Sequence, residues 1–237
     1  VSKKIKRKEV VSKTIESLQR DLDMQAPPRR IEAFDNSNIQ GKYPVAGMVC
    51  FIDGKPRKGE YRKFNIKTVD GIDDFASMKE VVFRKYKRAL DESTTLPDLI
   101  LIDGGKGQLS AAKSALDALG LDYIPIIGLA KKLEEVFKPG LSEAQNIPKT
   151  SPGLFLLRKI RDEVHRFAIS FHRSKRDKSM ITSIFQDIKG IGKVKIKALW
   201  TEFESLDQIA KTNPEKIMES LNVSEDIAKE IIKKSIK

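Results

Sequence analysis

The sequence predicts an α/β protein in which helices flank a mixed β-sheet, followed by a small domain made only of helices. Three observations lead to this prediction. Strand-like segments joined by short turns come first. A strand–helix–strand unit with wholly apolar strands follows, and the C-terminal residues show helical periodicity without a strand-like run. We expect a leading helix and linker over residues 1–28, the α/β domain over 29–178 and the helical domain over 179–237.

The first part of the α/β domain has the pattern of an antiparallel meander behind a leading helix. Residues 3–24 carry apolar side chains every three or four positions, as a helix does, and Pro27-Pro28 ends it. The segment 53–56, Asp-Gly-Lys-Pro, has the composition of a hairpin turn. The strands that this turn and a second one at 40–42 would join are 31–36, 45–52 and 61–66.

The second part of the domain alternates helices with buried strands. Residues 99–102 are continuously apolar, which indicates a strand buried on both faces, and Asp103 ends it. The basic stretch 173–178 is expected to be a hinge between the domains. The other expected elements are helices over 73–90, 107–119 and 152–175 and strands over 124–129 and 135–138.

Composition and charge favour a protein that binds nucleic acid in a reducing compartment. The net charge is +12 and the pI is near 9.6, which raises the expectation of a polyanionic partner. Cys50 is the only cysteine, so an intrachain disulfide and zinc clusters of Cys and His are excluded. Its apolar neighbours argue against a catalytic thiol. No apolar run could cross a bilayer and no signal peptide is recognisable, so we expect a cytoplasmic protein without a membrane partner.

Asp35 and Asp103 lie at the ends of two strands that are expected to be neighbours. Two such carboxylates raise each other's pKa, and burial adds to the cost, unless a cation lies between them. Mg²⁺ and Mn²⁺ accept these hard oxygen ligands. The pair therefore predicts a divalent metal site, although each aspartate on its own could equally be a turn residue.

The glycine-rich segment 103–108 invites a second interpretation, because flexible backbone before a helix suits phosphate oxygens. It departs from the Walker pattern, since Gly-Lys is not followed by Ser or Thr, and this disfavours nucleotide hydrolysis. Lys106, near the start of the next helix, could instead contact the phosphate of a strand that is to be cut.

The two histidines, His165 and His172, lie on the long predicted helix and on roughly one face of it. A helical histidine is more often a structural hydrogen-bonding residue than a ligand. The charged run 161–163 directly before His165 favours a functional site there. The spacing does not choose between the two histidines.

Two corners in the C-terminal region have the character of phosphate-binding hairpins. Gly190 and Gly192 permit a tight turn whose backbone N–H groups would face a phosphate, and the next helix adds its dipole. A degenerate copy begins at Leu221, where Glu225 and Asp226 replace lysines, so we expect weaker binding there; a plain interaction bundle is the alternative. The expected DNA-binding residues are Gly190, Ile191, Gly192, Lys193, Lys195, Asn222, Val223 and Ser224.

Five stretches resemble the C-terminal half of the UvrC family of bacterial excision-repair nucleases, from about residue 30 to the end. Four of them are FDNSNIQG at 34–41, GIDDFASM at 71–78, LIDGGKGQL at 101–109 and RDEVHRFA at 161–168, and the tandem hairpins are the fifth. The resemblance implies a ribonuclease H-like endonuclease domain that makes the 5′ incision next to a DNA lesion. A tandem helix–hairpin–helix domain would follow it.

The resemblance also implies roles for individual residues. It implicates an aspartate of the 71–78 motif, for which we choose Asp74 over Asp73, and Lys106 as a supporting residue. It favours the first of the two histidines as a ligand. The implied cofactor is Mg²⁺ or Mn²⁺, and the catalytic and metal-binding set is Asp35, Asp103 and His165.

The implied substrate is double-stranded DNA with a lesion or bubble, and the implied partner is a UvrB–DNA complex. The family's 3′ nuclease domain and its UvrB-binding helical hairpin have no counterpart here, so we expect neither 3′ incision nor the main UvrB contact. Two other functions stay open: a non-catalytic DNA-binding scaffold with a decayed nuclease fold, and a nuclease on the same fold that cuts RNA or recombination junctions.

Overall fold

The computed structural model describes the chain except for residues 1–10, 38–44, 70–72, 131–134, 204–205 and 237. Ser37 and residues 172–183 are described by their backbone alone. The chain divides into two compact units, residues 1–172 and 173–237. The sequence places the corresponding boundary between 178 and 179.

The first unit is built on a seven-stranded mixed sheet with the order β3-β2-β1-β5-β6-β7, to which β4 adds by pairing with β2. β1 pairs antiparallel with β2 and parallel with β5, and β5 pairs parallel with β6. The meander and the strand–helix–strand unit therefore share one sheet, as the sequence predicts. The strands are β1 (Arg30–Ser37), β2 (Val45–Ile52), β3 (Lys55–Pro56), β4 (Arg62–Asn65), β5 (Leu99–Asp103), β6 (Ile126–Ala130) and β7 (Glu135–Phe137).

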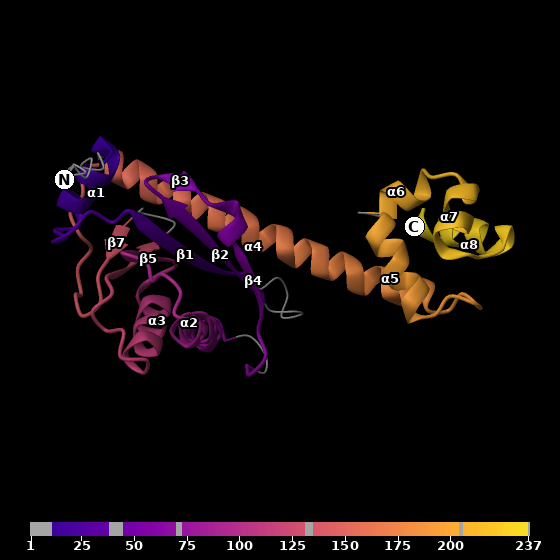
Figure 1. The fold of residues 1–237 in the computed structure, drawn as a ribbon, viewed down its shortest axis with the longest axis horizontal. Helices are drawn as coiled ribbons and strands as arrows, with labels where there is room; N and C mark the ends of the chain where they lie inside the picture. The colour runs from indigo at the N-terminus through magenta and orange to yellow at the C-terminus, as the bar shows by residue number, and fades with distance from the viewer. Residues whose placement is uncertain (1–10, 38–44, 70–72, 131–134, 204–205, 237) are drawn as a thin grey trace, which may run out of the picture. The chain divides into compact units, whose positions relative to one another are not determined.

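Helices cover both faces of this sheet (Figure 1). One face carries α2 (Asp74–Asp91) and α3 (Lys106–Asp117), and the other carries α1 (Lys13–Asp21) and the first part of α4 (Pro152–Phe185). The two faces are called the α2 face and the α4 face below.

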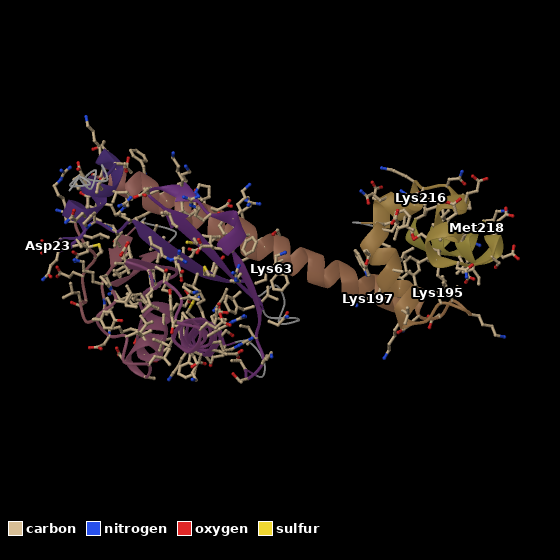
Figure 2. All side chains as sticks on the ribbon, viewed as in Figure 1. Asp23, Lys63, Lys195, Lys197, Lys216 and Met218 are labelled. Atoms are coloured by element: carbon tan, nitrogen blue, oxygen red, sulfur yellow. The ribbon has the colours of Figure 1, made fainter. Side chains whose placement is uncertain are left out.

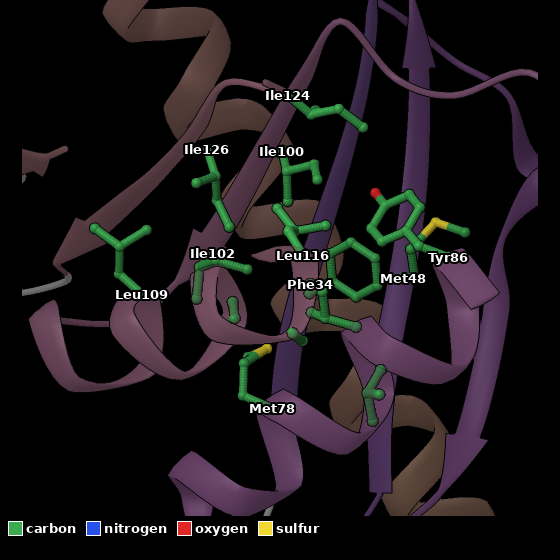
Figure 3. Packing of buried hydrophobic residues seen from close by; sticks show 14 of the residues in the cluster. Phe34, Met48, Met78, Tyr86, Ile100, Ile102, Leu109, Leu116, Ile124 and Ile126 are labelled. Carbon is green, nitrogen blue, oxygen red and sulfur yellow. The ribbon is translucent and has the colours of Figure 1, made fainter. Parts of the chain in front are cut away.

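Alternation along the strands divides the apolar core into two layers. In β1, Phe34 enters the layer on the α2 face, whereas Ile31 and Ala33 enter the layer on the α4 face. Figure 3 shows the first layer, in which the ring of Phe34 meets the edge of Tyr86 from α2. β5 is buried along its whole length because helices cover it on both sides.

The turn between β2 and β3 forms the hairpin that the sequence predicts. Both of its central residues have positive φ, 50° at Asp53 and 75° at Gly54, as a type I′ turn requires. β3 is only two residues long, and its Pro56 has no N–H to extend a ladder. A 3₁₀ turn over Lys58–Glu60 then leads the chain into β4, which pairs antiparallel with β2 as β3 does.

Two expectations about the ends of the first unit need correction. α1 is not a separate leader, because its apolar face is buried in the layer on the α4 face. The packing is close: a Cβ added to Gly153 of α4 would lie 2.7 Å from the Cα of Leu18. α4 does not end near 175 but continues to Phe185 through the expected hinge at 173–178, a stretch that contains neither Gly nor Pro.

The second unit forms its own apolar core among short helices, and the described residues from 186 onward contain no strand. Phe185 and Ile188 connect the end of α4 to this core. The helices are α5 (Lys193–Glu202), α6 (Leu206–Ala210), α7 (Pro214–Leu221) and α8 (Glu225–Ser235).

Candidate metal centre

The pleat of the sheet brings Asp35 and Asp103 together at the carboxyl ends of two parallel strands. Asp35 alternates with Ala33 in β1, and Asp103 with Leu101 in β5, and both apolar residues lie in the layer on the α4 face. The parallel pairing of β1 with β5 runs to the residue before each aspartate. Both carboxylates therefore project from the same edge of the sheet toward α4.

Helix α4 supplies the third group. Nδ1 of His165 lies 2.8 Å from Oδ2 of Asp35 and 3.4 Å from Oδ2 of Asp103. The three side chains offer one ligand atom each, and these atoms all lie within 4.8 Å of one another. Asp35 is 5% exposed and Asp103 9%, whereas the side chain of His165 is 37% exposed. The carboxylates are thus buried, and the imidazole lies on the open side of the group.

Gly47 permits this approach of α4, and sequence reasoning did not identify it. It is the β2 residue opposite Asp35. A Cβ at Gly47 would lie 3.0 Å from Cδ1 of Phe167 and 3.2 Å from the Cα of Ala168, one helical turn past His165. A larger side chain would therefore push α4 away from the carboxylates. The only signal in the sequence is a glycine inside an otherwise apolar strand, which indicates a close backbone contact.

The donor set fits a small divalent cation. Two adjacent carboxylates with little exposure repel each other, and burial further disfavours their charges. Two carboxylate oxygens and an imidazole nitrogen are ligands that Mg²⁺ and Mn²⁺ accept, and the partly exposed side of the group leaves space for water and phosphate oxygens. Asp35, Asp103 and His165 are the residues that could hold such an ion.

The aspartates of the 71–78 motif lie at the start of α2, next to the end of β1 that carries Asp35. Asp73 caps the helix, because its Oδ1 accepts two backbone N–H groups of the first turn at 3.0 and 2.9 Å. The carbonyl of Asp74 accepts Nδ2 of Asn36 at 2.8 Å, which ties α2 to the end of β1. The Asp74 carboxylate is not in the group of three. Residues 71–72, and 38–41 of the first motif, lie outside the described residues.

Lys106 is turned away from the carboxylates. Its Nζ donates to the carbonyl oxygen of Ser142 at 2.5 Å and lies 5.1 Å from the ring centre of Phe137, which belongs to the layer on the α2 face. A Cβ at Gly104 would overlap the Gln108 side chain, so this side chain covers the glycine-rich turn. For Lys106 to reach a phosphate at the metal centre, its exposed side chain would have to rotate.

Two other residues that the sequence raised as candidates are His172 and Cys50. The side chain of His172 is among those that the structure does not describe. Burial raises the pKa of the Cys50 thiol to about 12, so it would stay protonated at neutral pH.

None of the described helices has the length and apolar character needed to cross a bilayer.

In the second unit, the two expected hairpins lie close to each other. Gly190 has a φ of +93°, and a Cβ there would be 3.1 Å from Ile227 of α8. Asn222 adopts the left-handed conformation at the end of α7, and its carbonyl accepts Nζ of Lys195 at 3.4 Å. The helices that follow start from extended caps without a side-chain hydrogen bond, at Gly192 and Ser224.

Ile191 and Val223 differ from the other expected DNA-binding residues, because both pack on the core of the second unit and both N–H groups donate within the chain, that of Val223 to the carbonyl of Met218. The side chain of Ile191 is 6% exposed in this core, and its N–H donates to the carbonyl of Ile188. It therefore offers neither its side chain nor its N–H to a phosphate. Gly190, Gly192 and Lys193 around it are exposed.

Comparison with known proteins places the first unit in a family. The profile of the UvrC RNAse H endonuclease domain matches residues 19–169. The UvrABC system protein C of Flavobacterium johnsoniae is 48% identical over 223 residues, which is 94% of this chain and 37% of that protein. The UvrABC system protein C of Prosthecochloris aestuarii is 50% identical over 204 residues, 86% of this chain and 33% of that protein.

Comparison with solved structures matches part of the chain to endonucleases V. A Ciona intestinalis endonuclease V in complex with inosine-containing DNA aligns with a TM-score of 0.36 and 18% identity over 52% of this chain and 56% of that one. Human ENDOV aligns with a TM-score of 0.33 and 20% identity over 53% of this chain and 54% of that one. The family match confirms the ribonuclease H-like fold predicted from the sequence. The chain belongs to the UvrC family and spans about a third of the length of the curated relatives that it matches.

Proposed function

We propose that this chain is the part of a UvrC protein that makes the 5′ incision next to a DNA lesion in bacterial nucleotide excision repair. The observation that carries the proposal is the convergence of Asp35, Asp103 and His165 from two strands and a helix in an endonuclease domain. Its closest alternative is a decayed DNA-binding scaffold. The complete set of three metal-ligating side chains favours an enzyme over that alternative.

In the proposed mechanism, Asp35 and Asp103 would hold Mg²⁺ or Mn²⁺ through their carboxylate oxygens, and the partly exposed His165 would complete the ligand set. Bound there, divalent cations would supply activation of water for in-line attack on the phosphodiester and stabilisation of the leaving 3′ oxygen. The protein fixes the geometry: β1 and β5 hold the carboxylates, and the contact between Gly47 and α4 holds the imidazole. The products would carry a 3′-hydroxyl and a 5′-phosphate.

Asp74 and Lys106 have supporting roles in this proposal. The carbonyl of Asp74 anchors α2 to the end of β1, next to Asp35, and the Asp74 carboxylate is not part of the group of three. Lys106 at the start of α3 would turn its exposed ammonium from Ser142 to a substrate phosphate.

The second unit would contribute sequence-independent contacts to DNA phosphates, as a tandem helix–hairpin–helix domain. The exposed hairpin around Gly190 and Gly192 with Lys193 supports this role, and the hairpin at 222–224 would bind more weakly because acidic residues follow it. A UvrB–DNA complex in the cytoplasm is the proposed setting, with a lesion-bearing or bubble duplex as substrate.

The test is cleavage of a labelled bubble duplex in Mn²⁺, alone and in the reconstituted repair system with a lesion-bearing duplex. Asp35→Ala should abolish cutting while DNA affinity stays nearly unchanged, since the carboxylate is only 5% exposed. Asp91→Ala, at the exposed end of α2, is the matched control and should cut like the wild type. Cutting by Asp35→Ala at the wild-type rate, or faster cutting of RNA or junctions than of lesion-bearing DNA, would contradict the proposal.

A further inference from the structure

One row of residues crosses the sheet from the metal centre to its far edge. Asp35 pairs with Gly47 of β2, and Gly47 pairs with Lys63 of β4. Directly opposed residues point to the same face of a sheet, so Lys63 lies on the α4 face in line with the two aspartates. Two strand spacings separate Lys63 from Asp35, about 10 Å.

Lys63 is held in this place by aromatic rings of the helix that carries His165. Its Nζ lies 5.5 Å from the ring centre of Phe167 and 5.2 Å from that of Phe171. The side chain is exposed, and in Figure 2 it lies beside α4. Contacts of this kind orient an ammonium group while leaving its donors available to an anion. Between Lys63 and Asp35, α4 covers Gly47, since a Cβ there would lie 3.0 Å from Phe167 and 3.2 Å from Ala168, so His165 meets Asp35 on one side of the helix and Phe167 meets Lys63 on the other.

A surface depression of about 440 Å³ adjoins Lys63. The residues that line it include four cations and two aromatic rings but no carboxylate: Lys58, Tyr61, Arg62, Lys63, Arg166 and Phe167. Glu163, an acid that contacts two of these residues, is engaged, because it accepts Arg166 at 2.8 Å and the hydroxyl of Tyr61 at 3.1 Å. Tyr61 also packs edge-on against Phe167, with ring centres 5.2 Å apart. The depression is therefore positively charged, and its two aromatic rings contact each other.

We infer that this depression, with Lys63 at its inner edge, binds the phosphates of the substrate strand beside the one to be cut. The inference rests on the proposed function and adds a second contact with the strand: besides Asp103 and Asp35 on the His165 side of α4, it meets Lys63 and the cations around it on the Phe167 side. At roughly 3.4 Å per nucleotide along a duplex strand, the direct span of about 10 Å sets a minimum of about three nucleotides between the phosphate that meets Lys63 and the scissile one, because the strand has to pass around α4. Lys63 is thus a residue that positions the substrate.

The experiment measures binding of a fluorescent bubble duplex to the whole chain in EDTA, where no cleavage takes place, over a series of salt concentrations. Lys63→Gln should raise the Kd about fivefold and lower the slope of log Kd against log salt by about one, because one phosphate contact is lost. Lys63→Arg should restore both. Lys149→Gln is the control, an exposed lysine before the start of α4, and should match the wild type.

A second readout localises the contact. In duplexes that each carry one uncharged methylphosphonate, neutralising the phosphate that meets Lys63 should weaken binding to the wild type but not to Lys63→Gln. Equal Kd values and slopes for Lys63→Gln and Lys149→Gln would overturn the inference, and so would methylphosphonate effects that are the same in both. If the wild type binds DNA but does not cut it in Mn²⁺, the proposed hydrolysis is wrong. The salt slopes would still show whether Lys63 contacts a DNA phosphate.

Discussion

Strand β1 carries two buried carboxylates whose surroundings differ, and the difference separates a structural acid from a candidate catalytic one. Glu32, which is fully buried, points to the α2 face. It accepts the guanidinium of Arg30 at 2.7 Å and the hydroxyl of Tyr86 at 3.0 Å, and Lys85 lies at 3.4 Å. Asp35, three residues along the strand and on the α4 face, meets His165 and lies close to a second carboxylate, Asp103.

Cationic side chains of the protein compensate the charge of Glu32, whereas Asp35 shares the imidazole of His165 with a second acid, Asp103. Burial opposes the charge of Arg30, but its hydrogen bonds to Glu60 and Glu32 raise the pKa of this guanidinium above its usual range. Burial and the neighbouring Glu32 raise the pKa of Tyr86 as well, so it stays a hydrogen-bond donor. A buried acid alone is therefore weak evidence for a site; two acids converging on one imidazole are stronger evidence.

The largest expected effect separates cleavage from stability at the metal centre. Asp103→Asn should lower the rate of Mn²⁺-dependent DNA cleavage at least about 1000-fold, since losing the cation removes several kcal/mol of transition-state stabilisation. The Tm should stay equal or rise, because the change removes repulsion between two carboxylates. Single-turnover cleavage and thermal melting measure the two effects. A variant with a lower Tm and unchanged cleavage would make Asp103 a structural acid like Glu32.

At Glu32 we expect the converse result, a loss of stability without a loss of cleavage. Arg30→Met should lower the free energy of unfolding by about 3–5 kcal/mol, because it leaves Glu32 buried without its closest cation. Combining it with Glu32→Leu should recover most of the loss, and cleavage per folded molecule should stay unchanged in both. Urea denaturation and active-site-normalised cleavage test this. Stability equal to that of the wild type after Arg30→Met would remove the distinction between the two sites.

A smaller effect is expected from the contact that positions His165. Gly47→Ala should slow cleavage about tenfold and destabilise the fold by about 1–3 kcal/mol, because the new Cβ meets Phe167 and Ala168 of α4. Gly59→Ala is the matched control, since a Cβ there has no atom within 4 Å. Cleavage by Gly47→Ala at the rate of the control would show that the approach of α4 does not set the geometry of the site.

The two aspartates at the start of α2 should differ in the same way as Glu32 and Asp35. Asp73→Ala should lower the free energy of unfolding by about 1 kcal/mol, because it removes the N-cap, and should leave cleavage per folded molecule intact. Asp74→Ala should slow cleavage without lowering the Tm. Melting and cleavage of both variants under one condition decide the assignment. If Asp73→Ala slows cleavage and Asp74→Ala lowers only the stability, Asp73 is the residue that supports cleavage.

The smallest effects are expected at the hairpins of the second unit. Lys193→Gln should weaken DNA binding a few-fold and lower its salt slope by about one, whereas Glu225→Lys should strengthen binding by removing an acid beside the second hairpin. Fluorescence anisotropy over a salt series measures both. Binding that is unaffected by either change would favour a protein-interaction role for this unit.

The strand pattern in the sequence was enough to predict that Asp35 and Asp103 lie close together. The wholly apolar run 99–102 and the strand ending near Asp35 were enough to put both aspartates at one edge of a sheet, because parallel strands end together. The spacing of His165 and His172 on the helix did not show which of them is a ligand. The resemblance to the family favoured His165, and the structure places it beside both carboxylates.

What the sequence missed depends on contacts between distant segments. The role of Gly47 requires the position of α4, and the burial of Glu32 requires cations from its own strand and from α2. Lys106 follows Asp103 closely in the chain, yet the turn into α3 points it to the other face. The amphipathic pattern of α1 indicated a helix but not that the sheet would bury its apolar side.

The central claim is that Asp35, Asp103 and His165 hold a divalent cation, and diffraction from crystals soaked in Mn²⁺, recorded at the manganese absorption edge, tests it most directly. The account predicts an anomalous peak within bonding distance of a carboxylate oxygen of each aspartate and a ring nitrogen of His165. The peak should be lost in crystals of Asp35→Asn. A wild-type site that stays empty at saturating Mn²⁺, or a peak that persists unchanged in the variant, would contradict the account.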